Sequence, residues 1–554
     1  MPAWTPPTLR GYQRGWVRYD VLAGIAAGTV VIPQAMAYAT IAGLPVEVGL
    51  YTCMLPMLVY AALGGSRSLS ISTTSTIAVL TASALAVLPD DRSADELLRD
   101  AFTLTILVGL ALLLMRLFRL GSLVEQISPA TMIGVKTGVG LTVAVSQLPT
   151  LLGVSGDSEG EGFFGKLGDT LSKLDDANAV TVVVSAVAIG ILYLLRRVAP
   201  QVPGPLVVVA GAILLVAMTD VEQHGLALIE QVPSGLPTPT MPMWGDIGVL
   251  MPGAAAIAIM AFMETVIVAR AQRQRSEPPI DSDQELLANG VAALAGGLSQ
   301  SMPPAGGFSQ SAVNQRAGAR TQLAGVVTAV LAVLVALFLG PVLDDLPEAI
   351  LAAMVMVAVL GLVHPAEFTR LLRIDRAEFW VAVATAVIGL TAGLLLAVGV
   401  GVALTLVLVL RAVSQSQVRP VQPRVGGGWT INPETAEDTT AYDDVVLFHL
   451  DGGLFTGNAQ PTQDAIFAAA IERDPRPVAV VLEAAAVGKV TTPFLDVLEG
   501  LHADLGQEGI GFVVAALPPE AAEAARRAPW FTDFETDGLV QPTVDAAIER
   551  GRRG

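Results

Sequence analysis

Two polar, hydroxyl-rich stretches interrupt a sequence that is otherwise strongly apolar. The first runs from Ser68 to Thr76 and the second from Pro303 to Ser311. Each is followed by a short apolar stretch of helical period, so each would end in a helix start with free backbone N–H groups. Irregular backbone persists at membrane depth only where protein or a polar cavity surrounds it. Matching breaks in the two halves of a hydrophobic region therefore indicate a transporter's substrate site.

Hydroxyl groups and free N–H groups at a helix start can hold an anion without a fixed cation. The first break offers such groups on Thr73, Thr74, Ser75 and Thr76. The second offers Phe308, Ser309, Gln310 and Ser311, after prolines that prevent a helix and glycines that let the backbone approach closely. A single Ser or Thr in a membrane helix usually bonds its own backbone, but two clusters in equivalent places share a cause. We predict that these eight residues bind the substrate between two positive helix ends.

Glu264 is an acid within an apolar span. An ionisable group at this depth is unfavourable unless it faces a wet cavity, has a partner or takes up a proton. Glu264 lies on the first span of the second half, and its counterpart is the stretch 32–38, where Gln34 and Tyr38 offer polar groups. We predict that Glu264 binds the coupling ion, H⁺ or Na⁺, and that Gln34 and Tyr38 line the same cavity.

Lys136 is another charged side chain within a predicted span. Its position near the start of that span lets the long stem carry the ammonium to the membrane surface, so Lys136 is left out of the predicted site. The surrounding stretch 134–138 lacks the spacing and the preceding strand of a phosphate-binding loop, which argues against a nucleotide site.

The composition is that of a polytopic membrane protein. Of the 554 residues, 53% are hydrophobic and 15% are charged, and the mean hydropathy is +0.61. The single cysteine, Cys53, cannot form an intrachain disulfide, and the four histidines have no ligand spacing, so we predict no metal and no cofactor. No nucleophile and base pair is recognisable, and neither an enzyme nor a nucleic-acid partner is predicted. The net charge of −18 says little about the solute, because 10 basic and 21 acidic residues follow Arg411.

Apolar stretches of bilayer-spanning length recur up to Arg411. Twelve lie at about 17–39, 49–64, 100–118, 124–148, 178–195, 204–219, 247–269, 286–299, 321–340, 347–363, 377–392 and 394–412. Two short polar-headed stretches, at 74–88 and 309–317, bring the total to fourteen. With both chain ends in the cytoplasm, this count places most of the arginines between spans on the cytoplasmic side. We predict a multi-pass protein of the cytoplasmic membrane with cytoplasmic N- and C-termini.

The fourteen segments divide into seven and seven at the loop 220–245, which contains no lysine or arginine. An odd number in each half requires the second half to be inverted relative to the first. We predict a cytoplasmic N-terminal segment at 1–16, a first inverted repeat at 17–219 and a second at 247–413. The third segment of each half is the one that begins at a polar break.

A different pattern follows the last span. A linker containing glycine and proline is predicted at 414–440, and a small α/β domain at 441–554. Strands are predicted at 444–450, 477–482 and 511–517, and amphipathic helices at 462–471, 494–505 and 519–527. This domain is predicted to lie in the cytoplasm.

Several motifs resemble the sulfate permease (SulP) family, the relatives of vertebrate solute carrier family 26. They are Ile32-Pro-Gln-Ala-Met-Ala-Tyr-Ala39, Ala42-Gly-Leu-Pro45, Gly49-Leu-Tyr51, Ser66-Arg-Ser-Leu-Ser-Ile71, Gly307-Phe-Ser-Gln-Ser-Ala-Val-Asn314 and Ala317-Gly-Ala-Arg-Thr-Gln-Leu-Ala-Gly325. The resemblance covers nearly the whole chain, and the terminal domain resembles the STAS domain (sulfate transporter and anti-sigma-factor antagonist).

The resemblance implies a seven-plus-seven inverted repeat with core and gate domains, an elevator-like motion, a homodimer and an anion held between the two short helices. Members carry sulfate, bicarbonate, chloride or dicarboxylates, as proton or sodium symporters or as exchangers. Some relatives have an arginine where Gln310 stands, so this site must rely on helix ends and hydroxyls. The stretch 489–493 lacks the acid of bacterial STAS relatives, so docking or dimerisation is expected there in place of switching by phosphorylation.

These inferences predict a secondary active transporter of inorganic anions, sulfate first, coupled to protons or sodium. A bicarbonate or C4-dicarboxylate transporter of the same family is the alternative within transport. A nucleobase carrier of the same fold and a regulatory membrane protein with a cytosolic partner at its STAS domain are the alternatives from other classes.

Overall fold

The computed structural model describes residues 7–9, 12–89, 92–121, 128–154, 162–199, 202–219, 221–229, 235–275, 277–423, 429–430 and 444–553. They form two compact units, Met1–Thr405 and Leu406–Gly554.

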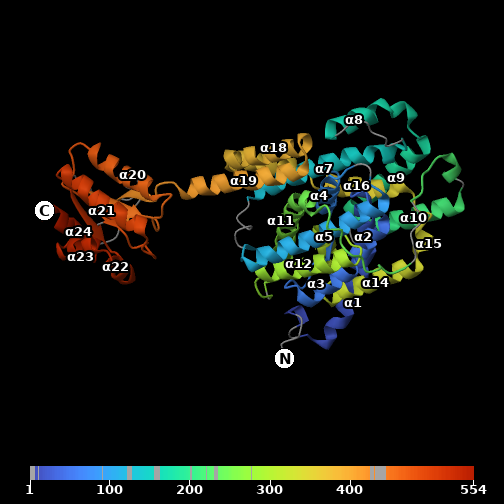
Figure 1. The fold of residues 1–554 in the computed structure, drawn as a ribbon, viewed down its shortest axis with the longest axis horizontal. Helices are drawn as coiled ribbons and strands as arrows, with labels where there is room; N and C mark the ends of the chain where they lie inside the picture. Colours follow the sequence, from blue (N-terminus) through green and yellow to red (C-terminus); the bar gives the residue numbers. More distant parts are fainter. Residues whose placement is uncertain are drawn as a thin grey trace. The chain divides into compact units, whose positions relative to one another are not determined.

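The first unit is helical, and all fourteen predicted spans fall on its helices (Figure 1). The first half contains α1 (Val17–Ile41), α2 (Val46–Thr52) with α3 (Leu55–Leu63), α4 (Ser75–Leu85), α5 (Ala94–Leu117), α7 (Pro129–Leu152), α9 (Ala179–Val198) and α10 (Gly204–Met218). The second contains α11 (Ile247–Gln272), α12 (Ser282–Leu298), α13 (Phe308–Arg316), α14 (Leu323–Phe338), α16 (Glu348–Leu360), α18 (Arg376–Thr391) and α19 (Leu394–Val413). Shorter helices α8 (Gly162–Ser172), α15 (Gly340–Leu343) and α17 (Pro365–Ile374) lie between them.

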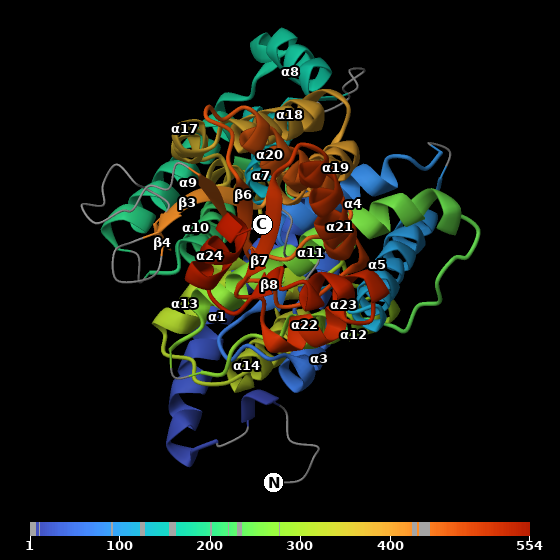
Figure 2. The ribbon, with the colours of Figure 1, turned by 90° about the vertical axis from the view of Figure 1, so that its left-hand side faces the viewer.

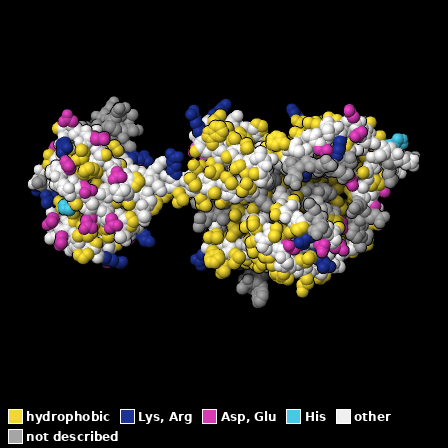
Figure 3. Space-filling view, turned by 45° about the horizontal axis from the view of Figure 1, so that its top comes forward, with side chains coloured by type: hydrophobic (Ala, Val, Ile, Leu, Met, Phe, Trp, Pro, Cys, Tyr) yellow, Lys and Arg dark blue, Asp and Glu magenta, His cyan; other side chains and the backbone are white. Residues whose placement is uncertain are grey.

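Length and composition alone identify half of these spans. Among the described residues, seven helical segments are long and apolar enough to cross a membrane, namely Arg14–Ile41, Val46–Leu63, Ala94–Leu117, Ala179–Val198, Ile247–Gln272, Glu348–Ile374 and Leu396–Val413. The rest are shorter or more polar helices. Hydrophobic side chains dominate the visible face of this unit, whereas acidic side chains are frequent on the second unit (Figure 3). The uneven charge along the sequence therefore reflects two different surroundings.

Two groups of helices make up the first unit. In one group, α5 packs along α11 and α12, and α1 packs along α14 (Figure 1). In the other, α7 packs along α16 and α18, and α9 packs against α16. Small residues permit the close approach, since a Cβ at Gly109 of α5 would lie 2.8 Å from the carbonyl oxygen of Gly290 of α12. Helix α4 contacts both groups, because it packs against α11 and α5 and also against α7 and α16.

The two polar breaks meet as a pair of short strands. Strand β1 (Ile71–Ser72) pairs antiparallel with β2 (Ala305–Gly306), with Ile71 opposite Gly306 and Ser72 opposite Ala305. Glycine is required at 306, because a Cβ there would lie 2.9 Å from Leu69 Cδ1 and 3.0 Å from Thr265 Cα. The strand pair fixes the start of α4 relative to the start of α13.

The second unit is a six-stranded sheet of order β4-β3-β5-β6-β7-β8, in which β5 to β8 are parallel (Figure 2). Its strands are β3 (Val418–Pro423), β4 (Trp429–Thr430), β5 (Val445–Leu450), β6 (Ala479–Glu483), β7 (Gly511–Ala515) and β8 (Val540–Gln541). Its helices are α20 (Ala459–Ile471), α21 (Thr492–Gln507), α22 (Pro519–Ala525), α23 (Pro529–Thr536) and α24 (Val544–Arg553). The three predicted strands and three predicted helices are confirmed as β5, β6, β7, α20, α21 and α22.

Each face of this sheet has its own core. On one face of the sheet, strand residues such as Phe448 and Leu482 pack with Phe494 of α21. On the other face, Leu447 and the strand residues that share its face pack with Ile548 of α24. This alternation is that of a parallel sheet covered by helices on both faces.

The prediction of a linker over 414–440 needs correction at its start. Strand β3 lies within that stretch and pairs antiparallel with β5, with Val418 opposite Leu450. Two prolines, Pro420 and Pro423, give the stretch the composition of a linker, although proline is compatible with a strand near the edge of a sheet. Residues 424–428 and 431–443 of the predicted linker and domain start lie outside the described residues.

Candidate functional site

Polar groups of the second half satisfy the backbone of the first break. The Ser70 N–H donates to Ser311 Oγ at 2.9 Å, and the side-chain amide of Asn314 donates to the Ser68 carbonyl at 3.2 Å. The amide of Gln322 donates to the carbonyls of Ser66 and Leu69 at 2.8 and 2.7 Å. A buried loop would otherwise leave these backbone groups without partners. The bonds hold the first break in one conformation within the helical unit.

Gln310 connects the two short helices. Its side chain is 2% exposed, and Ser72 Oγ donates to Gln310 Oε1 at 2.9 Å. Its amide nitrogen lies 3.5 Å from the Thr73 carbonyl oxygen, which is at the outer limit of a hydrogen bond. Gln310 and Ser311, both predicted to bind substrate, thus have side chains engaged in joining the breaks. This arrangement gives them a positioning role, and direct contact of either with substrate stays a prediction.

Thr74, at the end of the first break, contacts Glu264 of α11. Its hydroxyl oxygen accepts a bond from the Ile77 N–H at 3.3 Å and so forms the N-cap of α4. The same hydroxyl donates to Glu264 Oε2 at 2.8 Å. Glu264 is buried, with 7% of its surface exposed. Two residues singled out for different reasons, 190 positions apart, therefore lie in direct contact.

The neighbouring Thr265, which the sequence reasoning missed, holds the second break. Its hydroxyl oxygen accepts a bond from the Gly306 N–H at 3.0 Å and one from the Asn289 side chain at 3.3 Å, and it donates to the Ala261 carbonyl at 2.6 Å. Consecutive residues of α11 thus contact both breaks, Glu264 at the first and Thr265 at the second. The signal was available, because Thr265 directly follows the intramembrane acid.

Two buried polar atoms near this contact have no hydrogen-bond partner among the described residues. They are Gln34 Oε1 on α1 and Thr73 Oγ1 at the end of the first break. Tyr38, one turn after Gln34, is 7% exposed and lies close enough to Glu264 to be influenced by its charge. Helix α4 packs against both α1 and α11, so the helices that carry Gln34 and Tyr38, Thr74 and Glu264 are linked through α4. Buried polar groups normally find a partner, so these atoms are available to a solute or to water.

Phe308 begins α13 and keeps 48% of its surface exposed, although Gly307 and Gln310 beside it are buried. The ammonium of Lys136 on α7 lies 5.9 Å from the centroid of its ring. The extension of Lys136 to the membrane surface stays a prediction, and the structure adds a neighbour for it on α13. The Lys136 stem reaches the start of the second short helix, where the ring face offers a favourable contact for a cation.

The remaining predicted residues take different positions. Ser75 and Thr76 are buried in the first turn of α4, with 6% and 1% of their surfaces exposed. The side chain of Ser309 lies outside the described residues, although its backbone belongs to α13. Thus Tyr38, Thr74 and Glu264 lie together, Gln34 and Thr73 are close to them along the chain, and Phe308 is half exposed at the other helix start.

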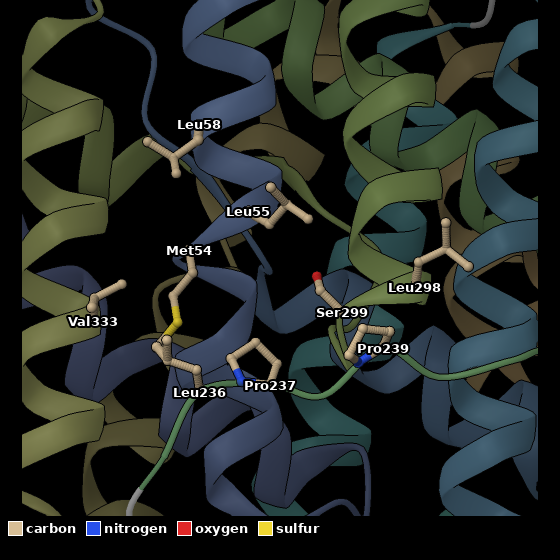
Figure 4. Close-up of a pocket in the computed structure, with 9 residues that line it drawn as sticks. All are labelled: Met54, Leu55, Leu58, Leu236, Pro237, Pro239, Leu298, Ser299 and Val333. Carbon is tan, nitrogen blue, oxygen red and sulfur yellow. The ribbon is translucent and has the colours of Figure 1, made fainter.

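A cavity elsewhere in the first unit is a poor candidate for the anion site. It has a volume of about 400 Å³ and is lined by Met54, Leu55, Leu58, Leu236, Pro237, Pro239, Leu298, Ser299 and Val333 (Figure 4). None of these residues belongs to either break, and Ser299 is the one polar side chain among them. A lining of this kind offers nothing to hold a charged solute.

Comparison with known proteins identifies the family. The sequence model of the sulfate permease family matches residues 17–385, and that of the STAS domain matches residues 437–547. The chain belongs to the sulfate permease family. A probable sulfate transporter of Mycobacterium tuberculosis is 34% identical over 560 residues, covering 99% of this chain and 98% of the relative. The chloroplastic sulfate transporter 4.1 of Arabidopsis thaliana is 30% identical over 480 residues, covering 83% of this chain and 68% of the relative.

Solved structures share the fold of this family member. Murine Slc26a9, an anion transporter in the inward-facing state, matches with a TM-score of 0.87 at 20% identity over 99% of this chain and 93% of that one. The transmembrane domain of the cyanobacterial bicarbonate transporter BicA matches with a TM-score of 0.60 at 21% identity over 71% of this chain and 98% of that one. The resemblance deduced from the motifs, a helical membrane unit followed by a STAS domain, is confirmed.

Proposed function

We propose that the chain is a secondary active transporter of inorganic anions, with sulfate as its first substrate. The observation that carries this proposal is the hydrogen bond from Thr74 to Glu264, which puts a titratable group at one of two helix starts. Membership of the sulfate permease family supports it, as does the 34% identity to a probable sulfate transporter over 99% of the chain. Transport, in place of catalysis, is thus the assigned activity.

The anion lies between the N-terminal ends of α4 and α13 in this proposal. Free N–H groups and the helix dipoles attract negative charge there, and the hydroxyl of Thr73, which has no partner among the described residues, donates to an oxygen atom of the anion. The strand pair β1–β2 keeps both helix ends aimed at the same space. The side-chain oxygen of Gln34 accepts a hydrogen bond from a partly protonated anion or from a bound water molecule.

Glu264 supplies the coupling in this proposal. At an effective dielectric constant of about 20, an ionised carboxylate about 5 Å from a divalent anion opposes its binding by on the order of 6 kcal/mol. A proton or a sodium ion on Glu264 removes most of that repulsion. Anion binding and cation binding therefore favour each other, as linkage requires of a symporter. The Thr74 hydroxyl stays bonded to Glu264 in both protonation states. It donates to the ionised carboxylate and accepts from the protonated carboxyl group.

Alternating access is proposed to be of the elevator type. Both breaks belong to the group that contains α1, α4, α5 and α11 to α14, while α7, α9, α16 and α18 form the other group. Sliding of the first group past the second carries the anion site across the bilayer as one body. Both termini are proposed to lie in the cytoplasm, and the chain is proposed to act as a homodimer whose STAS domain contacts a cytosolic partner.

Uptake by the purified full-length chain in proteoliposomes tests the proposal. We expect radiolabelled sulfate to enter when the outer solution is acidic or contains sodium, and unlabelled sulfate to compete better than bicarbonate, fumarate or chloride. Stronger competition by bicarbonate or fumarate would instead assign the alternative substrate of the same site. Absence of uptake of all four anions would contradict anion transport, and uptake of a nucleobase would place the chain in another class.

A further inference from the structure

Lys136 lies on α7, within the stretch 124–148 predicted to cross the membrane. It follows Pro129, the first residue of the helix, by seven positions, which corresponds to roughly 10 Å along the axis. A hydrocarbon core is about 30 Å thick, so a lysine at this position of a span is expected to lie inside it. A cation at such depth normally has an anionic partner or lies against a wet cavity.

The described residues offer this cation no counter-charge. Within the part of the chain that the structure describes, no carboxylate lies at ion-pair distance from the Lys136 ammonium and no hydrogen bond reaches it. Its ammonium makes a cation–π contact with the ring of Phe308, whose centroid lies 5.9 Å away. Glu264, the acid of the site, is bonded to Thr74. The contact with Phe308 holds the ammonium in place without neutralising it.

The surroundings of Lys136 are themselves positive. Phe308 is the first residue of α13, whose N-terminal end carries partial positive charge. A lysine at this position, with no carboxylate beside it, makes the local electrostatic potential more positive. A bound anion would neutralise that potential. Phe308 keeps 48% of its surface exposed, so the protein leaves about half of it uncovered.

We propose that the Lys136 ammonium is the cation of the anion site and that it favours divalent over monovalent oxyanions. This inference rests on the proposed function and deepens it. Gln310 is uncharged and its side chain is bonded by Ser72, so the second helix start has no cation of its own, and Lys136 supplies that charge from a different helix. Helix α7 belongs to the group that contains α16 and α18, whereas the breaks belong to the group that contains α4 and α13. The cation therefore contacts the anion in the arrangement of the two groups that this structure has.

The proposal predicts an effect that depends on the charge of the anion. The Coulomb energy between a fixed cation and an anion scales with the anion's charge, so the loss for a divalent anion is about the square of the loss for a monovalent one. If neutralising Lys136 weakens chloride binding about threefold, it weakens sulfate binding about tenfold. A residue with only a structural role would weaken both anions by the same factor.

The experiment uses the purified full-length chain and measures binding directly. Titrations with sodium sulfate and with sodium chloride, followed by the rise in unfolding temperature, give apparent dissociation constants for wild type, K136M, K136Q and K136R. The matched control is K166M, which removes an equal charge from an exposed position on α8. Two neutral variants are used so that a folding defect in one leaves the other, and uptake of both anions into proteoliposomes is measured in parallel.

The expected result is a sulfate-to-chloride preference that falls at least threefold in K136M and K136Q and is retained in K136R and K166M. An unchanged preference in a folded neutral variant would overturn the role of Lys136, while binding by wild type would leave the proposed function standing. Failure of the wild-type chain to bind or carry either anion would overturn both. A third outcome is that both neutral variants fail to fold, while K136R folds and keeps its preference. The positive charge would then be needed for folding in the absence of an anion, and the proposal would also be overturned.

Discussion

The hydrogen bond between Thr74 and Glu264 joins a helix start of the first half to an acid of the second half. It gives a single carboxyl group two tasks, because Glu264 both orients the Thr74 hydroxyl and sets the charge beside it. Thr265, the next residue, holds the other break through the Gly306 N–H. Two consecutive residues of α11 therefore contact both breaks.

Replacing Glu264 with Gln separates these two tasks. E264Q keeps an oxygen that accepts the Thr74 bond but removes the titratable charge, so we expect sulfate uptake that no longer responds to a proton or sodium gradient. The measurement is initial uptake in proteoliposomes at several external pH values and sodium concentrations. E367Q, on the exposed face of α17, is the matched control and should respond as wild type does. Gradient-dependent uptake that survives in E264Q would show that the coupling site lies elsewhere.

Replacing Thr74 with Val keeps the side-chain shape and removes the hydroxyl. T74V loses the N-cap of α4, which typically contributes about 1 kcal/mol, and leaves Glu264 without its donor. We expect uptake to fall at least tenfold while the unfolding temperature drops by only a few degrees. T81V on the same helix is the control, because the Thr81 hydroxyl is buried and makes no hydrogen bond among the described residues. Equal uptake by T74V and T81V would remove Thr74 from the site.

At the scale of elements, the sequence predicts segments better than it predicts their partners. Hydropathy and charge located fourteen helices, and the hydroxyl-rich composition located both breaks, because each property is local. The pairing of β1 with β2 and the bond between Ser72 and Gln310, 238 residues apart, depend on how the two halves pack. The contact of Lys136 with Phe308 escaped for the same reason, since a flexible stem can extend toward either the membrane surface or a neighbouring helix.

The strand pair offers a test of the idea that the breaks must cross closely. In G306A the new Cβ would lie 2.9 Å from Leu69 Cδ1 and 3.0 Å from Thr265 Cα, and the second of these is backbone that cannot turn away. We expect the start of α13 to shift and sulfate uptake to fall at least tenfold. G211A on α10 is the control, because a Cβ there meets nothing within 4 Å and alanine favours a helix. Uptake by G306A equal to that of G211A would contradict the need for close crossing.

At the scale of the whole molecule, the chain consists of two units with separate cores. The first buries its polar breaks among helices that expose hydrophobic side chains, and the second has a sheet with a core on each face. Composition predicted this division, because hydropathy falls and acidic residues accumulate after Arg411. It did not predict where the second unit begins, since the prolines of β3 resemble those of a linker and a strand is recognisable there only through its pairing with β5.

The start of the second unit decides which fragment folds by itself. Val421 of β3 is 6% exposed and packs with Val445, Leu447 and Ile548, so a fragment that begins at residue 441 loses this contact and exposes the edge of β5. Burying a valine contributes about 2 kcal/mol, which corresponds to roughly 5 °C or more in unfolding temperature for a domain of this size. We therefore expect a fragment of residues 414–554 to unfold cooperatively at least 5 °C above a fragment of residues 441–554 in calorimetry. V421D in the longer fragment should reproduce the loss and Q415A, at an exposed position before the strand, should not. Equal unfolding temperatures for the two fragments would mean that β3 adds nothing to the sheet and that the second unit begins after it.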